Sequence, residues 1–273
     1  MQGASRAALA EVRGQLSALV AELPDAAGVG GIAEGLFAVV RLLDREGSLR
    51  RSLADPTTPF DAKERLLEGL LGDQLDALPM RVLKDVVRPR WSSARHLVDA
   101  VEVLAVTAVF LVAEADGRLD AVEDELFRFA RTVSREPELR AVLTDRALDV
   151  DRKQALLGGL LDGKVQPGTL RIVEALVLAP RGRTLEDGLE AFAALAADVR
   201  SRTLATVTSA VPLDEGQQAR LAAVLTRQLG RTVQLLVEVD PAVVGGVVVH
   251  VGDEVIDGST VHRLSEARRN FTR

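Results

Sequence analysis

LFAVVRLLDREGSLRRSL, residues 36–53, returns in altered form as LFRFARTVSREPELRAVL at residues 126–143. The two stretches lie ninety residues apart, and the same shift pairs FDAKERLLEGLL at residues 60–71 with VDRKQALLGGLL at residues 150–161. Within each stretch the apolar residues recur at three- and four-residue spacings, which is typical of amphipathic helices. Self-similarity at a long fixed period indicates a repeated structural unit. The chain therefore contains two copies of one helical unit.

The segments before and between these stretches are also predicted to be helical. Apolar spacing predicts helices over residues 7–23 and 32–45, separated by residues 24–31, whose proline and glycines are expected to break the helix. A long apolar helix is predicted from Ala94 to Ala115. It is expected to end the first bundle and also to begin the second, because no separate starting helix precedes Asp120. Two bundles that share a helix cannot rotate freely relative to each other.

Three helices are expected to begin with a capping box. In this motif an aspartate accepts a hydrogen bond from the amide three residues on, and an acid or amide at that position reaches back. Each cap is worth about 1 kcal/mol. The pairs are Asp61 with Glu64, Asp151 with Gln154, and Asp214 with Gln217.

After residue 201 the pattern changes from helical to mixed. LATVTSAV, residues 204–211, is predicted to form a strand that ends at Pro212. A helix is expected next, and apolar residues then alternate with other residues over 233–239, which predicts a second strand.

The segment that follows is rich in turns. VVVHV, residues 247–251, predicts a strand with its odd-numbered valines on one face. A glycine–aspartate turn at residues 252–253 is expected to reverse the chain, so that the short apolar segment at residues 255–256 runs back. Ser259 is expected to cap a final helix. This end of the chain is therefore a small sheet-and-helix unit.

Two motifs in this unit resemble those of a known family. DPAVVGGVVVHVGDEVIDGS, residues 240–259, resembles the C-terminal signature of the delta subunit of F-type ATP synthases, the bacterial counterpart of the mitochondrial oligomycin-sensitivity-conferring protein. TVTSAVPLDEGQ, residues 206–217, resembles that family's entry into the same small domain. The matching signature positions are Asp240, Pro241, Gly245, Gly246, Gly252, Asp253, Ile256, Asp257 and Gly258.

The resemblance implies a domain plan. Delta subunits usually carry one N-terminal helical bundle, and the second copy occupies its place. The first copy is extra, as in actinobacterial-type members of the family. The expected fold is α+β and mainly α, with an extra bundle over residues 1–112, a second bundle over 113–201 and a small α/β domain over 202–273.

The resemblance also implies function and partners. It implies a non-catalytic peripheral-stalk (stator) subunit of the proton-translocating synthase, on the cytoplasmic face of the cell membrane and attached to it only through the complex. The helical part would hold the N-terminal helices of the alpha subunits, the C-terminal domain would join the b-type stalk subunit, and the beta subunit is a further candidate partner. The sequence leaves open whether the extra copy binds a second alpha subunit or braces the stalk.

A partner helix could bury its apolar face between two helices of the second copy. We expect this groove to be lined by one helix near residue 127 and another near residue 173. Periodicity cannot separate groove positions from core positions in these helices. The candidate groove residues are Leu126, Phe127, Ala130, Leu170, Val173 and Val177.

Composition excludes several other classes of protein. The net charge of −6 argues against a nucleic-acid binder, which would carry a basic footprint. There is no cysteine, hence no disulfide, thiol nucleophile or cysteine-based metal site. The longest apolar run, residues 103–113, is shorter than the roughly 20 residues that span a bilayer, so it is expected to be a core helix.

Two glycine motifs imitate nucleotide sites but lack the required context. Residues 158–164, GGLLDGK, match the start of a P-loop, yet Val165 has no hydroxyl for magnesium and the glycines follow a helix rather than a strand. A helix-ending turn is the better interpretation. Residues 28–33 follow no buried strand and are interpreted as a helix–helix linker. No cofactor is expected.

The remaining candidate residues have structural explanations. His96, His250 and His262 lack carboxylate partners at ligand spacing, so no metal is expected. No side chain has an evident partnering base, so no catalytic residue is expected. Trp91, among basic residues, is either an anchor for a partner or a plug in the joint between helices.

Two rival hypotheses remain. The first is a helical-repeat adaptor unrelated to the synthase, for which the C-terminal signature would be dispensable. The second is an enzyme that binds phosphate at residues 158–164 and would lose ATP affinity on Lys164→Ala.

Overall fold

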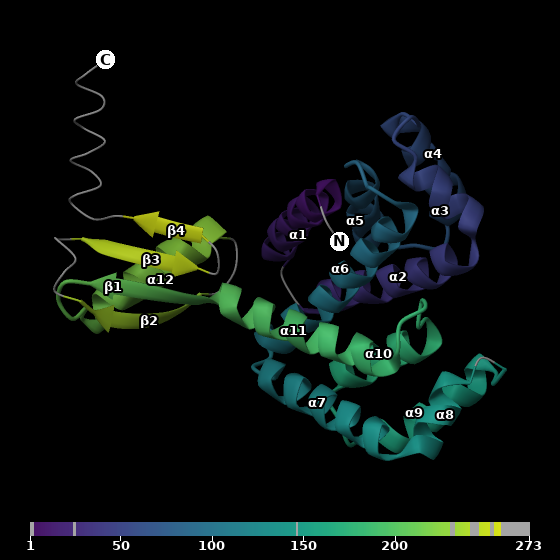
Figure 1. Ribbon diagram of the computed structural model, residues 1–273. Helices are drawn as coiled ribbons and strands as arrows, with labels where there is room; N and C mark the ends of the chain where they lie inside the picture. Colours follow the sequence, from purple (N-terminus) through teal and green to yellow (C-terminus); the bar gives the residue numbers. More distant parts are fainter. Residues whose placement is uncertain are drawn as a thin grey trace. The chain divides into compact units, whose positions relative to one another are not determined.

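The computed structural model forms two compact units, residues 1–196 and residues 197–273, and each is considered by itself. The first unit contains both helical copies (Figure 1). The second contains a small sheet and one helix, and the division falls within helix α11. The structure describes residues 3–23, 26–145, 147–229, 233–240, 246–251 and 254–257.

The first copy is a bundle of helices joined by short connections (Figure 1). Its apolar side chains form a continuous core, in which residues such as Leu36, Leu83 and Leu104 are fully buried. Its helices are α1 (Ala4–Glu22), α2 (Ala26–Arg45), α3 (Gly47–Ala54), α4 (Phe60–Leu71), α5 (Ala77–Val87) and α6 (Ala94–Ala115).

The second copy repeats this plan ninety residues later. The bounds of α8 and α9 coincide with those of α3 and α4 after the shift, and α7 ends where α2 would end. The repeat seen in the sequence is therefore a repeat of structure. The helices are α7 (Leu119–Arg135), α8 (Pro137–Thr144), α9 (Val150–Leu161), α10 (Pro167–Leu178) and α11 (Leu185–Thr203).

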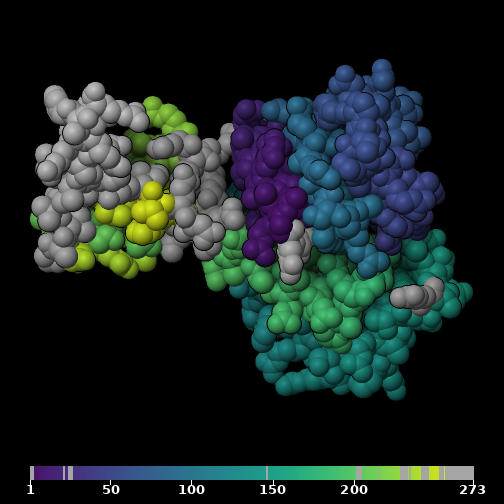
Figure 2. Space-filling view, turned by 45° about the horizontal axis from the view of Figure 1, so that its top comes forward, coloured from purple at the N-terminus to yellow at the C-terminus, as the bar shows by residue number. Residues whose placement is uncertain are grey.

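Helix α6 belongs to both copies. It packs against α1, α2, α3 and α5 of the first copy and against α7 and α10 of the second. The ninety-residue shift also places α1, residues 4–22, on residues 94–112 of α6. Helix α6 is thus the last helix of the first copy and the first helix of the second, which confirms the predicted shared helix. Figure 2 shows the teal and green surface of the second copy lying directly against the blue surface of the first.

Helix α6 is also the one described helix long and apolar enough to cross a membrane by composition. Its most apolar window is 72% buried inside the protein. Both copies cover it, so it serves as a core helix of the bundle, as its sequence predicts. Its bounds, Ala94–Ala115, are those predicted from the sequence.

The predicted break at residues 24–31 is wrong from Ala26 onward. Helix α2 begins at Ala26 and contains the glycine run that resembles a linker. Val29 and Ile32, within and just after that run, are buried. Burying such side chains contributes about 1.5–3 kcal/mol each, which outweighs the roughly 1 kcal/mol that a glycine costs a helix.

Two of the three predicted capping boxes are wrong. Helix α4 begins after Pro59 and helix α9 after Asp149, with no side-chain hydrogen bond at either cap. Asp61 and Asp151 instead lie in the first turns, where a carboxylate favours the positive end of the helix dipole. The third box is confirmed. Gln217 N donates to Asp214 Oδ1 at 2.7 Å, and Asp214 N donates to Gln217 Oε1 at 2.9 Å.

The second unit is a four-stranded mixed sheet with α12 (Glu215–Leu229) (Figure 1). The strand order is β2-β1-β3-β4, with β1 parallel to β2 and antiparallel to β3. Its core joins buried valines of the strands to Leu225 of α12. The predicted strands are confirmed, and the predicted final helix after Ser259 lies outside the described residues. The strands are β1 (Leu204–Ser209), β2 (Gln234–Val239), β3 (Val247–Val251) and β4 (Glu254–Asp257).

Two glycines of α2 provide a matched test of how closely α2 packs against α5. A Cβ atom at Gly35 would lie 2.6 Å from Pro79 of α5, whereas one at Gly30 would meet nothing within 4 Å. We expect Gly35→Ala to destabilise the protein by about 1–3 kcal/mol through overpacking. Gly30→Ala is expected to stabilise it by about 0.5–1 kcal/mol through helix propensity.

Urea unfolding of both variants would measure this difference. Equal effects of the two substitutions would mean that α2 and α5 do not pack as closely as described.

Candidate functional site

The predicted groove residues of the second copy lie on α7 and α10, which pack against each other. Leu126, Val173 and Val177 are buried between helices, so they belong to the core of the bundle. A partner could not contact these three side chains without separating the helices. Sequence periodicity could not make this distinction, because core and groove residues are equally apolar.

The other three groove candidates are accessible. Phe127 of α7 is 57% exposed, and Ala130, one turn further on, is half-buried. The guanidinium of Arg131 lies over the Phe127 ring at 5.8 Å from its centroid. Leu170 of α10 is half-buried and lines a hollow with Arg171. An exposed phenylalanine on a strongly amphipathic helix is a typical anchor for a partner.

The signature residues of the C-terminal unit shape the ends of its strands. The amide of Asp240, just after β2, donates to the carbonyl of Ser209 at 2.9 Å. Gly246 has a φ of 83°, a left-handed conformation that favours glycine, immediately before β3. Ile256 and Asp257 pair with β3 in β4. Pro241, Gly245, Gly252, Asp253 and Gly258 lie outside the described residues.

The P-loop-like turn is a helix end. Helix α9 runs through residues 158–161, and Gly163 adopts a φ of 69° just after it. The Lys164 ammonium donates to the carbonyls of Gly159 at 3.2 Å and Leu160 at 3.0 Å. The lysine therefore caps its own helix, as the helix-ending interpretation predicts.

The two histidines that the structure describes lie in different units. His96 Nδ1 lies 3.0 Å from Ser5 Oγ at the start of α6, and His250 is exposed on β3. His262 lies outside the described residues. Within the described part of the chain, no group of three His, Cys, Asp or Glu side chains is placed to hold a metal ion.

Trp91 is a plug rather than an exposed anchor. Its ring is 4% exposed, and its Nε1 donates to the carbonyl of Val86 at 2.8 Å. Nearby, the Arg88 guanidinium lies over the Phe60 ring at 4.3 Å. These contacts close the joint between α5 and α6 in the first copy.

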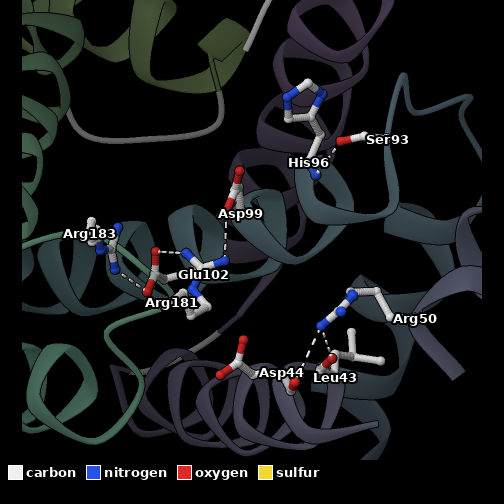
Figure 3. Close-up of polar contacts among 9 residues, drawn as sticks. All are labelled: Leu43, Asp44, Arg50, Ser93, His96, Asp99, Glu102, Arg181 and Arg183. Carbon is white, nitrogen blue, oxygen red and sulfur yellow. Dashed lines mark hydrogen bonds and ion pairs between the residues drawn. The ribbon is translucent and has the colours of Figure 1, made fainter. Parts of the chain in front are cut away.

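The equivalent joint of the second copy is polar. Arg181 stands ninety residues after Trp91, in the turn between α10 and α11. Arg183 N donates to the carbonyl of Pro180 at 3.1 Å, and Arg181 and Gly182 have φ values of 50° and 79°. Positive φ at both central positions is the geometry of a type I′ turn, which is uncommon for arginine. The turn directs Arg181 toward α6 (Figure 3).

The two arginines of this turn meet a buried carboxylate of the shared helix (Figure 3). Glu102, 2% exposed in the middle of α6, accepts from Arg181 Nη2 through Oε2 and from Arg183 Nη2 through Oε1. Asp99, one turn earlier, accepts from Arg181 Nη1 at 2.7 Å. The Arg183 guanidinium also lies 5.1 Å from the centroid of Phe192 in α11. This ion cluster ties both copies together.

The sequence pointed only partly to this cluster. Arg181 and Arg183 are visible as residues flanking the second joint, but Glu102, just before the apolar run of residues 103–113, belongs to no recognisable motif. A charged residue inside a core helix is itself a signal, because a buried charge requires a partner.

The outer faces of the copies differ in charge. In the first copy Lys84 binds Glu64 at 2.9 Å and Glu68 at 2.6 Å, and these hydrogen bonds raise the pKa of the lysine. Glu174 stands at the equivalent position of the second copy. Burial raises the pKa of its carboxyl, although Arg171 and Arg41 act in the opposite direction.

Comparisons with known proteins agree over most of the chain. Residues 106–271 match the sequence model of the family described as ATP synthase delta (OSCP) subunit. A protein from Streptomyces coelicolor named ATP synthase subunit delta is 50% identical, with 99% of this chain and 98% of that protein covered. The protein of the same name from Thermobifida fusca is 47% identical, with 99% of each covered.

The family model and the full-length relatives differ in which of the two copies they cover. The family model begins within α6, so it covers the second copy and the C-terminal unit. The full-length relatives extend the match over the first copy as well. A chain of the Toxoplasma gondii mitochondrial ATP synthase hexamer also matches, at 22% identity over 62% of this chain and 95% of that one. Its TM-score of 0.30 is too low to compare the folds.

Removing the Glu102 charge tests the ion cluster. We expect Glu102→Gln to destabilise the protein by about 3–5 kcal/mol, because it leaves Arg183 without its carboxylate and the buried Arg181 with Asp99 alone. Glu34→Gln is the control, since Glu34 pairs with Arg171 across the same two copies but in an exposed position. Its effect should stay within about 1 kcal/mol.

Chemical denaturation would compare the free energies of unfolding. A small effect at Glu102 would show that the cluster adds nothing to the attachment of the two copies.

The raised pKa of Glu174 gives a pH dependence with a definite sign. The folded protein holds this proton to higher pH than the unfolded chain, so this group's contribution to stability rises as pH falls from neutrality through the raised pKa. Glu174→Gln should therefore raise stability at neutral pH and remove this part of the slope. Unfolding curves measured from neutral pH down to the ordinary range of a glutamate carboxyl would show this slope, and unchanged slopes would contradict it.

Proposed function

The chain belongs to the family of ATP synthase delta (OSCP) subunits, and on that premise we propose how its two units serve the complex. It is a non-catalytic, structural subunit of the peripheral stalk of the F-type ATP synthase. The match over 99% of the chain to delta subunits carries this conclusion. As part of that complex the subunit is associated with the membrane, and we place it on the cytoplasmic face.

A stator subunit must resist torque between the head and the membrane. The two copies share α6 and are joined by the buried Glu102 cluster. They therefore form one compact unit rather than two domains connected by a flexible linker. A flexible hinge between the copies would bend under torque instead of transmitting the torque. The shared helix supports the proposal that the extra copy lengthens or stiffens the arm.

The second copy is the proposed docking site for the N-terminal helices of the alpha subunits. Phe127 and Ala130 lie on the same face of α7, at the spacing that meets a helical partner, and Leu170 adds a half-buried apolar position on α10. Of the six groove positions expected from sequence, these three are accessible. The C-terminal unit is the proposed attachment to the b-type stalk, and the beta subunit is a further candidate neighbour.

A pull-down from detergent-solubilised membranes tests these assignments. The tagged full-length chain should capture alpha, beta and b-type subunits. Removal of Ser201–Arg273 should abolish capture of the b-type subunit and leave alpha capture in place. Failure of the full-length chain to capture synthase subunits would contradict the stator function. Equal loss of all subunits on truncation would contradict the division of roles.

The proposed alpha contact is tested by Phe127→Asp. A charge at this exposed position should reduce capture of the alpha subunit at least tenfold, about 1.4 kcal/mol or more, without unfolding the bundle. Leu160→Asp is the matched control, because Leu160 is also an exposed, large apolar side chain of the second copy but lies on α9. Alpha capture that is unchanged in Phe127→Asp, or equally reduced in both variants, would exclude α7 as the docking helix.

A further inference from the structure

A large cavity opens in the second copy beside the turn that carries the ion cluster. Its volume is about 1020 Å³, and it is bounded by α8, α9 and the connection between α10 and α11. This size lies at the upper end of the roughly 300–1,000 Å³ typical of small-molecule sites. Arg95 of the first copy reaches its edge, so residues of both copies line it.

The lining includes a buried lysine without a partner. Lys153 of α9 is 7% exposed, and among the described residues it has no hydrogen-bond acceptor or ion-pair partner. The side chain lines the cavity and its ammonium group is not sealed off inside the protein, so an anion in the cavity could pair with it. The cavity is the space into which such a partner would fit.

The arginines of the turn also leave donors unused. Arg181 and Arg183 give their terminal nitrogens to Asp99 and Glu102, but the Nε atoms of both arginines are buried and have no partner. Both residues line the cavity. Three cationic side chains, those of Lys153, Arg181 and Arg183, thus line one cavity.

The first copy shows the same lysine with its partner in place. Lys63, ninety residues before Lys153, is equally buried and donates to the carbonyl of Val87 at 3.4 Å. The equivalent carbonyl in the second copy is that of Val177, and Lys153 forms no such bond to it. The difference between the copies is therefore local to this joint.

Side-chain size accounts for the hollow at the second joint. In the first copy the equivalent positions hold the larger residues Phe60, Arg88 and Trp91, with the arginine stacked on the phenylalanine. Val150 and Leu178 stand at the equivalent positions of Phe60 and Arg88, and both line the cavity. The side chain at the position of Trp91, Arg181, turns toward α6 instead.

We propose that this cavity binds the phosphate group of a small molecule, held by the Lys153 ammonium and attracted by the positive charges of Arg181 and Arg183 in the same lining. A phosphate presents several acceptor oxygens and negative charge, which match an ammonium group that has no other partner beside two further cationic side chains. Leu148, Val150 and Leu178 supply an apolar wall next to these donors. An organic phosphate should therefore bind more tightly than inorganic phosphate. The inference is independent of the proposed stator function.

Isothermal titration of the isolated full-length chain tests the site. The probes are ATP, inorganic phosphate and adenosine, each at the same ionic strength. We expect one saturable site for ATP, weaker binding of inorganic phosphate and none of adenosine. Equal affinities for ATP and inorganic phosphate would overturn the apolar-wall part of the inference. Absence of saturable binding by both phosphates would overturn the whole of it.

Two substitutions distinguish the site from general attraction of anions. Lys153→Gln should weaken ATP binding at least tenfold. Lys63→Gln removes an equally buried lysine from the first copy, and Arg152→Gln removes one charge from the exposed residue next to Lys153. Both controls should leave ATP affinity within twofold of the unaltered chain. An equal loss in either control would overturn the assignment to Lys153.

A third variant keeps the test valid if Lys153→Gln fails to fold. Val150→Phe installs the side chain of the first copy at a partly exposed position, so it should fill the cavity without changing any charge. It should weaken ATP binding at least tenfold. Lys164→Ala should leave binding unchanged because Lys164 caps α9, whereas a loss there would place the phosphate at the helix-ending turn instead.

Discussion

The carboxylate of Glu102 is buried in the one helix that both copies need, and the attachment of the copies depends on how it is neutralised. Both of its oxygens accept from arginines of the turn after α10, so the charge is compensated only when the second copy is docked. Apolar contacts along α6 provide most of the burial, but they do little to specify how α6 is aligned with the second copy. The ion cluster fixes which turn of α6 meets which turn of the second copy, because a shift of either would leave a charge without a partner.

The two copies show how one scaffold supports different joints. At one position the first copy has Trp91 and the second has Arg181, while α1 has Val12 where α6 has Glu102. A hydrophobic plug is thereby exchanged for an ion pair. The exchange is consistent with the double role of α6, since an internal helix shared by two bundles benefits from a specific contact more than a terminal helix does. It also leaves a cavity that the first copy fills with aromatic and arginine side chains.

These features suit a subunit of a peripheral stalk. A stalk carries load between partners that bind at separate places, so rigidity within the helical part matters as much as affinity at its ends. Sharing α6 makes the two copies one compact unit, and Phe127 of α7 remains exposed on its surface. The signature of the C-terminal unit serves its fold at Asp240 and Gly246, where it ends one strand and begins the next. No step of this role requires a catalytic group.

The sequence by itself determined the repeat, the type and order of the elements and the family. Helical spacing, strand alternation and turn residues are local signals, and the ninety-residue shift aligns them between copies. Prediction from the sequence failed where a contact with a distant segment outweighs a local conformational preference. The glycines of residues 28–31 are helical because Val29 and Ile32 are buried, and Asp61 and Asp151 are not caps because their helices begin earlier than the motif indicates.

Tertiary structure alone decided which apolar residues are exposed and which face the core. Leu126 and Phe127 are adjacent and equally apolar, yet one is buried and the other exposed, because α10 covers only one side of α7. It also decided the pairing of Glu102 with Arg181 and Arg183 across about eighty residues of chain. Periodicity reports the face of a helix but not its neighbour, so contacts between segments distant in sequence emerge only when the helices pack.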